Sequence, residues 1–126
     1  MKYIKTILAI LVAAASLYSC KTQYDLVLEG NDIDAKYNLA FDYFNNGKYL
    51  KAAELFESLS LLTNGSSKDD TVRYYLGLSN YSSKDYYTAE TNFDNFLKSY
   101  PLSPFAENAE FLRIDCLYKA TLRYEL

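Results

Sequence analysis

A pattern that returns every 37 residues constrains this chain more than any other feature of its sequence. Between about residue 34 and residue 118, aromatic and small residues recur at the same places when the chain is shifted by 37 positions. The matching positions are Tyr37, Tyr74 and Phe111; Leu39-Ala40 and Leu76-Gly77; Phe44, Tyr81 and Tyr118; Tyr49 and Tyr86; Ala52 and Ala89; and Phe56 and Phe93. A fixed period of this length indicates a repeat protein, in which each unit buries its apolar face against the next.

Each repeat unit has the pattern of two helices joined by a tight turn. In the first unit the apolar residues of 34–45 share one helical face, and Asn45-Asn46-Gly47 ends that helix because Asn and Gly tolerate the left-handed conformation. A second helix follows, whose apolar face carries Tyr49, Ala52, Ala53, Phe56 and Leu59. The polar stretch 63–70 predicts a loop, and Asp69 or Asp70 is the expected N-cap of the next helix.

The small and aromatic residues of the unit resemble the tetratricopeptide repeat. A small residue in the first helix, Gly-x-Tyr at the bend and Ala-x-x-x-Phe in the second helix carry the resemblance. Ala40 and Gly77 allow the paired helices to approach closely, and Phe56 and Phe93 fill the space toward the next unit. We therefore predict an all-α tetratricopeptide-repeat helical solenoid over residues 32–126, with repeats at about 34–66 and 70–103 and a partial third at 104–126.

The third unit contains only a first helix. Ser103 and Pro104 are suited to open it, and its apolar pattern runs to about Lys119. Ile114 stands where the earlier units have a small residue, and no second-helix pattern follows before Leu126. Two interpretations stay open at this point: a helix that caps the second repeat, or a chain that lacks the rest of a longer array.

The first 19 residues have the pattern of an export signal. A short basic start is followed by an unbroken apolar run over residues 7–15, which is too short to span a bilayer. Leu17-Tyr18-Ser19-Cys20 resembles the lipobox of bacterial lipoproteins, which implies cleavage before Cys20 and acylation of its thiol and of the new N-terminus. Lys21 rather than Asp follows, so we expect an anchor in the outer membrane, facing the periplasm, with residues 20–31 as a lipidated tether. An ordinary signal peptide with a chance Cys is the alternative.

Composition excludes several classes of function. The chain has no His, which removes imidazole-based catalytic triads and His-ligated metal sites. Its net charge is −3, or −5 once Lys2 and Lys5 leave with the signal, which gives no electrostatic attraction for nucleic acid. With Cys20 acylated, Cys116 is the remaining thiol, and its place in a helical pattern predicts a buried, inert side chain. We expect no metal, and no cofactor other than the covalent lipid.

Several motifs together resemble the BamD family of outer-membrane protein assembly factors. They are Gly47-Lys48-Tyr49, Arg73-Tyr74-Tyr75-Leu76-Gly77, Asp85-Tyr86, and the stretch from Phe93 to Tyr100 followed by Pro101 and by Ser103-Pro104-Phe105-Ala106-Glu107. The last stretch meets the family form F-x-x-F-x-x-x-Y-P-x-S-P-[YF]-A-E in full. Related sequences continue through an R-Y-E-L stretch into further repeats, so the resemblance favours a chain that carries the N-terminal part of the array.

The resemblance implies a non-catalytic scaffold of the machine that inserts β-barrel proteins into the outer membrane. Its partners would be the barrel-shaped insertase, unfolded barrel proteins, and the membrane through the lipid. The first helices of a tetratricopeptide array line its concave face, where aromatic side chains would form a groove for the aromatic C-terminal strand of substrates. The expected groove residues are Tyr37, Phe41, Phe44, Tyr74, Leu78, Tyr81, Phe111 and Tyr118. The alternative for each is a place in the core between repeats.

Three other interpretations fit parts of the sequence. A generic periplasmic tetratricopeptide-repeat lipoprotein that coordinates cell-envelope or peptidoglycan machinery would share all but the stretch that ends at Glu107. A glycan-binding lipoprotein would usually use Trp, which the chain lacks. An enzyme with paired carboxylates could use Glu54, Glu57 or Glu90, but their spacing is typical of a solvated helix face.

Overall fold

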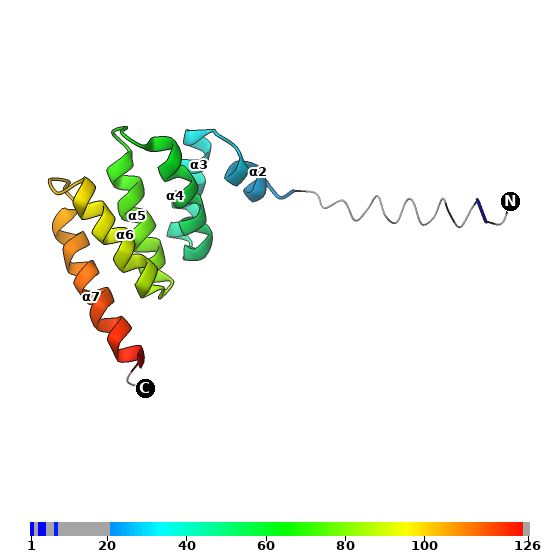
Figure 1. The fold of residues 1–126 in the computed structure, drawn as a ribbon. Coiled ribbons are helices and arrows are strands. Elements are labelled where there is room, and N and C mark those ends of the chain that lie inside the picture. Colours follow the sequence, from blue (N-terminus) through cyan, green and yellow to red (C-terminus); the bar gives the residue numbers. More distant parts are fainter. Residues whose placement is uncertain (2, 5–6, 8–20, 125–126) are drawn as a thin grey trace.

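Short polar turns divide the chain into helices that lie side by side in the computed structural model (Figure 1). The structure describes residues 1, 3–4, 7 and 21–124, so the expected lipid attachment at Cys20 and most of the expected signal fall outside the described residues. The helices are α2 (Gln23–Glu29), α3 (Ile33–Asn45), α4 (Tyr49–Thr63), α5 (Asp69–Ser82), α6 (Tyr86–Ser99) and α7 (Ala106–Tyr124). No strand occurs in these ranges, which confirms the all-α prediction. None of the described helices is long and apolar enough to cross a membrane.

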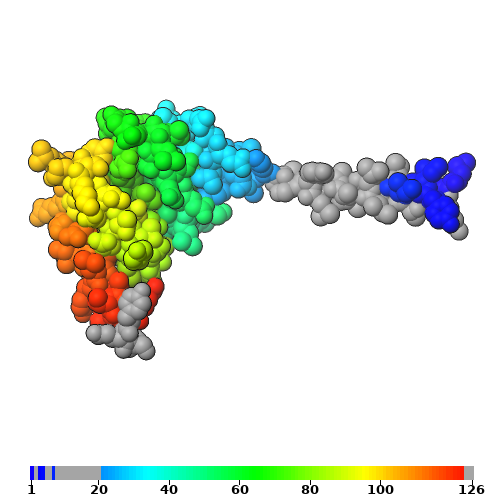
Figure 2. Space-filling model, in the orientation of Figure 1, coloured from blue at the N-terminus to red at the C-terminus, as the bar shows by residue number. Residues whose placement is uncertain are grey.

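From α3 onward, each helix packs mainly on its neighbours in sequence, as in a solenoid. The large interfaces join α3 to α4, α4 to α5, α5 to α6, and α6 to α7. Contacts also run between the first helices of successive repeats, such as the rings of Phe41 and Tyr75 at 4.7 Å and the hydrogen bond from the Tyr81 hydroxyl to Asp115. Helices α2 and α7 therefore lie at opposite ends of the array (Figures 1 and 2). This arrangement agrees with the predicted tetratricopeptide-like solenoid.

The small residues of the repeat lie where helices approach most closely. Ala40, Ala52 and Ala89 are fully buried. At Gly77, a Cβ atom added to the backbone would stand 2.7 Å from Cε1 of Phe93, well inside van der Waals contact. The ring of Phe93 therefore fills the space that a side chain on residue 77 would need, which explains the glycine at this position.

The turns between paired helices use the left-handed conformation once in each complete repeat. Gly47 has a φ of +73°, as expected from its place after the Asn pair. Lys84, 37 residues later, adopts the same conformation with a φ of +67°, although it carries a side chain. The geometry of this turn is therefore kept where the sequence has lost the glycine that favours it.

The segment expected to be a tether contains a helix that packs on the first repeat. Thr22 caps α2 by accepting a hydrogen bond from the backbone of Asp25, whose side chain in turn binds the Thr22 backbone. The ring of Tyr24 meets that of Tyr43 edge-on at 5.4 Å, and its hydroxyl donates to Glu54. Helix α2 is thus held against both α3 and α4, and little of the segment is left as a free linker.

The other end of α2 is fixed by a buried lysine. Lys36 is 1% exposed, and its ammonium donates to the Leu28 carbonyl at 2.9 Å and to the Ser58 hydroxyl at 2.6 Å. Burial lowers the pKa of Lys36 because no carboxylate compensates its charge. Tyr24 contacts the end of α3 while Leu28 contacts its beginning, so α2 runs antiparallel to α3.

The expected N-cap of α5 is wrong, because Asp69 is the first residue of the helix itself. Its side chain is fully buried and accepts hydrogen bonds from Thr63 Oγ1 at 3.0 Å, Arg73 Nε at 2.8 Å and the Tyr100 hydroxyl. Burial alone would raise the pKa of Asp69, but these donors bring it below the ordinary carboxyl value. Asp69 therefore joins three helices or their ends rather than capping one. Lys68, at the N-cap position, makes no side-chain cap.

Candidate peptide-binding surface

Three of the expected groove residues lie together on α3. The rings of Tyr37 and Phe41 are 4.8 Å apart, and Phe41 and Phe44 both contact Tyr75 of α5, at 4.7 and 5.2 Å. All four side chains are half-buried, so each keeps part of its ring at the surface. Tyr75 was not among the expected groove residues, although it lies at the centre of this cluster and also contacts Phe56.

Tyr74 is a core residue in the structure and is not part of an open groove. Its side chain is 5% exposed and stacks on Phe105, with ring centroids 4.5 Å apart and planes 12° apart. Its hydroxyl accepts a hydrogen bond from Asn108, and burial raises its pKa. A ligand could reach this ring only if the packing of α5 against the start of α7 opened.

Leu78 and Tyr81 stand between the core and the surface. Leu78 is half-buried against a hydrophobic cluster that lies between α5, α6 and α7. The Tyr81 hydroxyl donates to Asp115 at 2.6 Å, and the ammonium of Lys119 lies 4.6 Å from the Tyr81 ring centroid. The bond to Asp115 raises the pKa of Tyr81, while Lys119 lowers the pKa of Asp115. The polar tip of Tyr81 is therefore already used to hold α7 against α5.

Phe111 and Tyr118 lie on an open face of α7. Phe111 is 66% exposed and Tyr118 is 62% exposed, and Ile114 and Leu117 between them are exposed as well. Phe111 also lines a hollow of about 420 Å³ with Pro104, Glu107 and Asn108. Within residues 21–124, no ring contact links Phe111 or Tyr118 to the aromatic cluster of α3 and α5. The expected groove residues thus divide into a half-buried cluster, a core ring and a separate exposed face.

The exposed face of α7 has the chemistry of a site for apolar side chains. Its residues 111, 114 and 118 recur at helical spacing, so they form one stripe along the helix. Exposed apolar stripes of this kind mark surfaces where other polypeptides bind. Spacing along the sequence proposed Phe111, Tyr118 and Tyr74 alike. It could not tell that, among the described residues, neighbouring helices would cover Tyr74 and leave Phe111 and Tyr118 exposed.

Three of the four side chains considered for catalysis are engaged within the fold. Cys116 is fully buried, as predicted, and burial raises its pKa to about 11, so the thiol is unreactive at neutral pH. Glu54 accepts the Tyr24 hydroxyl, and Glu90 lies 3.5 Å from the guanidinium of Arg113. Glu57 is exposed. Cys116, Glu54 and Glu90 are thus engaged within the fold, while Glu57 lies at the surface.

Comparison with protein families decides the family of this chain. The family model described as outer membrane lipoprotein, YfiO, matches residues 30–124. The chain belongs to this outer membrane lipoprotein family. The match confirms the resemblance found in the sequence, since the YfiO family is related to BamD. Among curated proteins, no significant match to the chain is found.

The matched range shows which part of the structure the outer membrane lipoprotein family shares. It contains all of α3 to α7, and therefore the aromatic cluster, the core ring of Tyr74 and the open face of α7. Helix α2 ends at Glu29, just before the match begins. The family also supports a location at the outer membrane.

Proposed function

We propose that this protein is a lipid-anchored, non-catalytic factor for the assembly of β-barrel proteins in the outer membrane. Membership of the outer membrane lipoprotein family, over residues 30–124, is the observation that carries the proposal. The lipid at Cys20 would hold the solenoid at the periplasmic face of the membrane. The proposed partners are unfolded barrel proteins and the barrel-shaped insertase.

The proposed binding surface for unfolded barrel proteins is the open face of α7, with the half-buried aromatic cluster of α3 and α5 as a second, separate contact. Phe111 and Tyr118 offer rings that are already accessible, so a ligand need not disturb the core to reach them. Burial of one aromatic ring of the ligand against such a surface contributes about 1.5–3 kcal/mol. Unfolded barrel strands rich in aromatic residues would suit this surface, whereas Tyr74 is left out because it is buried.

The anchor is tested by replacing the proposed acylation site. Cys20→Ala should abolish labelling with palmitate and release the protein from membranes, because one residue supplies both acylation positions. Cys116→Ala is the matched control, since that thiol is buried and should not carry lipid. Labelling that persists in Cys20→Ala would refute the anchor.

The partner proposal is tested by cross-linking in intact envelopes. A photo-reactive residue at position 111 or 118 should capture nascent barrel proteins or the insertase, and the same probe at Leu61 on α4 should not. Leu61 is 80% exposed and so matches these positions in accessibility, but it lies on another helix. Capture of peptidoglycan enzymes alone would favour a generic envelope scaffold over the proposed role.

A further inference from the structure

The positive charges of the described chain are distributed unevenly. Six of its basic side chains form ion pairs with carboxylates; these are Lys21, Lys68, Arg73, Lys98, Arg113 and Lys119. Lys36 is buried. Among residues 21–124, the basic side chains that are exposed and have no carboxylate partner are Lys48, Lys51, Lys84 and Arg123.

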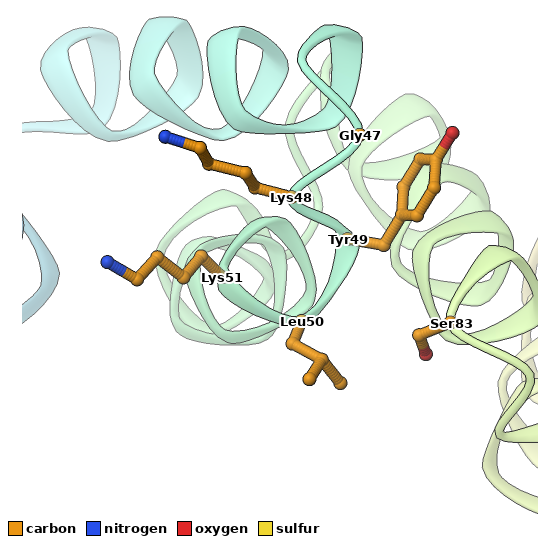
Figure 3. A pocket seen from close by; sticks show the side chains of 6 residues that line it. All are labelled: Gly47, Lys48, Tyr49, Leu50, Lys51 and Ser83. Carbon is orange, nitrogen blue, oxygen red and sulfur yellow. The ribbon is translucent and has the colours of Figure 1, made fainter.

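These four cations lie along one edge of the solenoid, where the turns between paired helices meet the end of α7. Lys48 lies in the α3–α4 turn and Lys51 in the first turn of α4, and both line a hollow of about 490 Å³ together with Ser83 of the α5–α6 turn (Figure 3). Arg123 in turn approaches the carbonyl of Lys84 at 3.5 Å, which places the end of α7 beside the same turn. The residues that carry these charges therefore lie along one edge, although they come from three parts of the sequence, and the Lys48 and Lys51 side chains extend away from Ser83 on the side of Tyr24 (Figure 3).

Two large apolar side chains project from the same edge. Leu50 is 69% exposed and Tyr87 is 82% exposed, and they occupy equivalent positions 37 residues apart at the start of α4 and α6. In Figure 3, Leu50 points away from the helices, while Lys48 and Lys51 extend together to one side. We call the surface formed by Lys48, Leu50, Lys51, Lys84, Tyr87 and Arg123 the turn edge.

The cations of the turn edge form no ion pair with a carboxylate of the described residues, although the charge of Lys51 adds to the Thr22 hydrogen bonds that lower the pKa of Asp25. Asp85 caps α6 by accepting from the Thr88 amide, and Asp42 accepts from the Asn46 side chain. The ammonium groups of Lys48 and Lys51 lie over aromatic faces: Lys48 is 5.5 Å from the Tyr43 ring centroid, and Lys51 is 4.8 Å from that of Tyr24. Ring faces leave the N–H donors of an ammonium group available for oxygen acceptors such as phosphate.

Helix α2 brings this edge close to the proposed lipid anchor. Gln23, the first residue of α2, follows Cys20 by three residues, and three residues of extended chain span at most about 11 Å. Because α2 runs antiparallel to α3, its first turn lies at the end of α3 that leads into the turn edge, and Tyr24 there contacts the ammonium of Lys51. A lipid on Cys20 would therefore hold the turn edge, rather than the opposite loops, near the bilayer.

We propose that the turn edge rests on the phospholipid surface, with its four cations against headgroup phosphates and with Leu50 and Tyr87 at the interface. This inference rests on the proposed lipidation of Cys20. A lipid anchor together with basic side chains gives a bilayer contact that neither provides alone. The contact sets the orientation of the solenoid, because the edge of both repeats would lie along the membrane.

The test uses the full acylated chain in vesicles that contain anionic phosphatidylglycerol. A fluorophore attached at Leu50→Cys should be shielded from a water-soluble quencher, and the same fluorophore at Leu61→Cys should not. Leu61 is also exposed and lies on the same helix, about 16 Å along its axis from Leu50. Cys116 is buried and does not compete for the label.

Charge removal checks the electrostatic part of the proposal. Each lysine near an anionic bilayer strengthens binding about fivefold, so Lys48→Gln/Lys51→Gln should weaken the contact by about twenty-five-fold and expose the label at residue 50. Lys98→Gln, in the ion pair with Asp94, is the matched control and should leave the shielding unchanged. Vesicles of phosphatidylcholine alone should give less shielding than anionic ones.

The outcomes separate this contact from the anchor on which it depends. Mass spectrometry of the same sample reports the acylation of Cys20, and its absence would overturn the anchor and the contact together. If Cys20 is acylated but the labels at 50 and 61 are quenched equally, the anchor stands and the contact is wrong. Shielding that persists in Lys48→Gln/Lys51→Gln would likewise overturn the phosphate contact.

Discussion

The interlock between Gly77 and Phe93 gives the sharpest test of why the repeat keeps a small residue in its first helix. In an ordinary helix interior, replacing Gly by Ala stabilises a protein by about 1 kcal/mol. Here the added Cβ would stand 2.7 Å from Cε1 and 2.9 Å from Cδ1 of a fully buried ring, which must move by several tenths of an ångström. Overpacking of this kind costs about 1–3 kcal/mol. We therefore expect Gly77→Ala to destabilise the protein by about 1 kcal/mol, opposite in sign to the helix propensity.

The measurement is a double-mutant cycle followed by urea unfolding and helical circular dichroism. Phe93→Leu removes the ring atoms that the new Cβ would meet, so Gly77→Ala should become neutral or stabilising in that background. The expected coupling between the two sites is about 1–3 kcal/mol. Ala40→Gly, at the equivalent position of the first repeat, removes a fully buried methyl group as well as helix propensity and should destabilise by about 2 kcal/mol. A stabilising Gly77→Ala in the otherwise unchanged chain would refute the packing argument.

Three further predictions concern single side chains. The native donors hold the pKa of Asp69 below its ordinary 3.8, so its contribution to the free energy of unfolding is complete well above 3.8 and is lost as the pH falls below 3.8 toward the native pKa. Asp69→Asn should flatten this dependence in acid titrations and cost about 3 kcal/mol at neutral pH. Because burial raises the pKa of Cys116 to about 11, a thiol reagent at neutral pH should modify it only as fast as the protein opens, and rapid native modification would contradict its burial. Lys84→Gly should stabilise by about 0.5–1 kcal/mol in thermal unfolding by relieving a positive φ, while Gly47→Ala should destabilise; equal effects at the two turns would contradict the assignment of strain.

The repeat pattern predicted the solenoid well because its physical basis is local. Small residues at fixed spacing set the distance between neighbouring helices, and Gly47 set the turn, so α3 to α6 follow from the sequence alone. The buried thiol of Cys116 was also predicted, since its place on a helix face could be read from the spacing. These features follow from residue spacings that can be read along single helices and their turns.

The misses depend on contacts that spacing does not encode. Tyr74 and Tyr75 are adjacent aromatic residues, and the pattern could not say which would stack in the core on Phe105 and which would lie among the rings of α3. Asp69 has the residue type and position typical of a helix cap. Its actual donors could not be predicted, because they come from positions up to 31 residues away. Short α2 has no strong helical pattern of its own, and the contacts of Tyr24 and Leu28 hold it in place.

The contacts of α2 also limit when this helix can dock during folding. Tyr24 hydrogen-bonds to Glu54, and the Leu28 carbonyl accepts from Lys36 and Ser58. The beginning of the chain therefore has no complete docking site until about thirty more residues are available. A chain that emerges N-terminus first must therefore complete its first helical hairpin before α2 can close over it. During that interval Lys21 and Thr22 are not yet held by the fold, so the proposed cleavage and acylation at Cys20 would have access to their site before α2 docks.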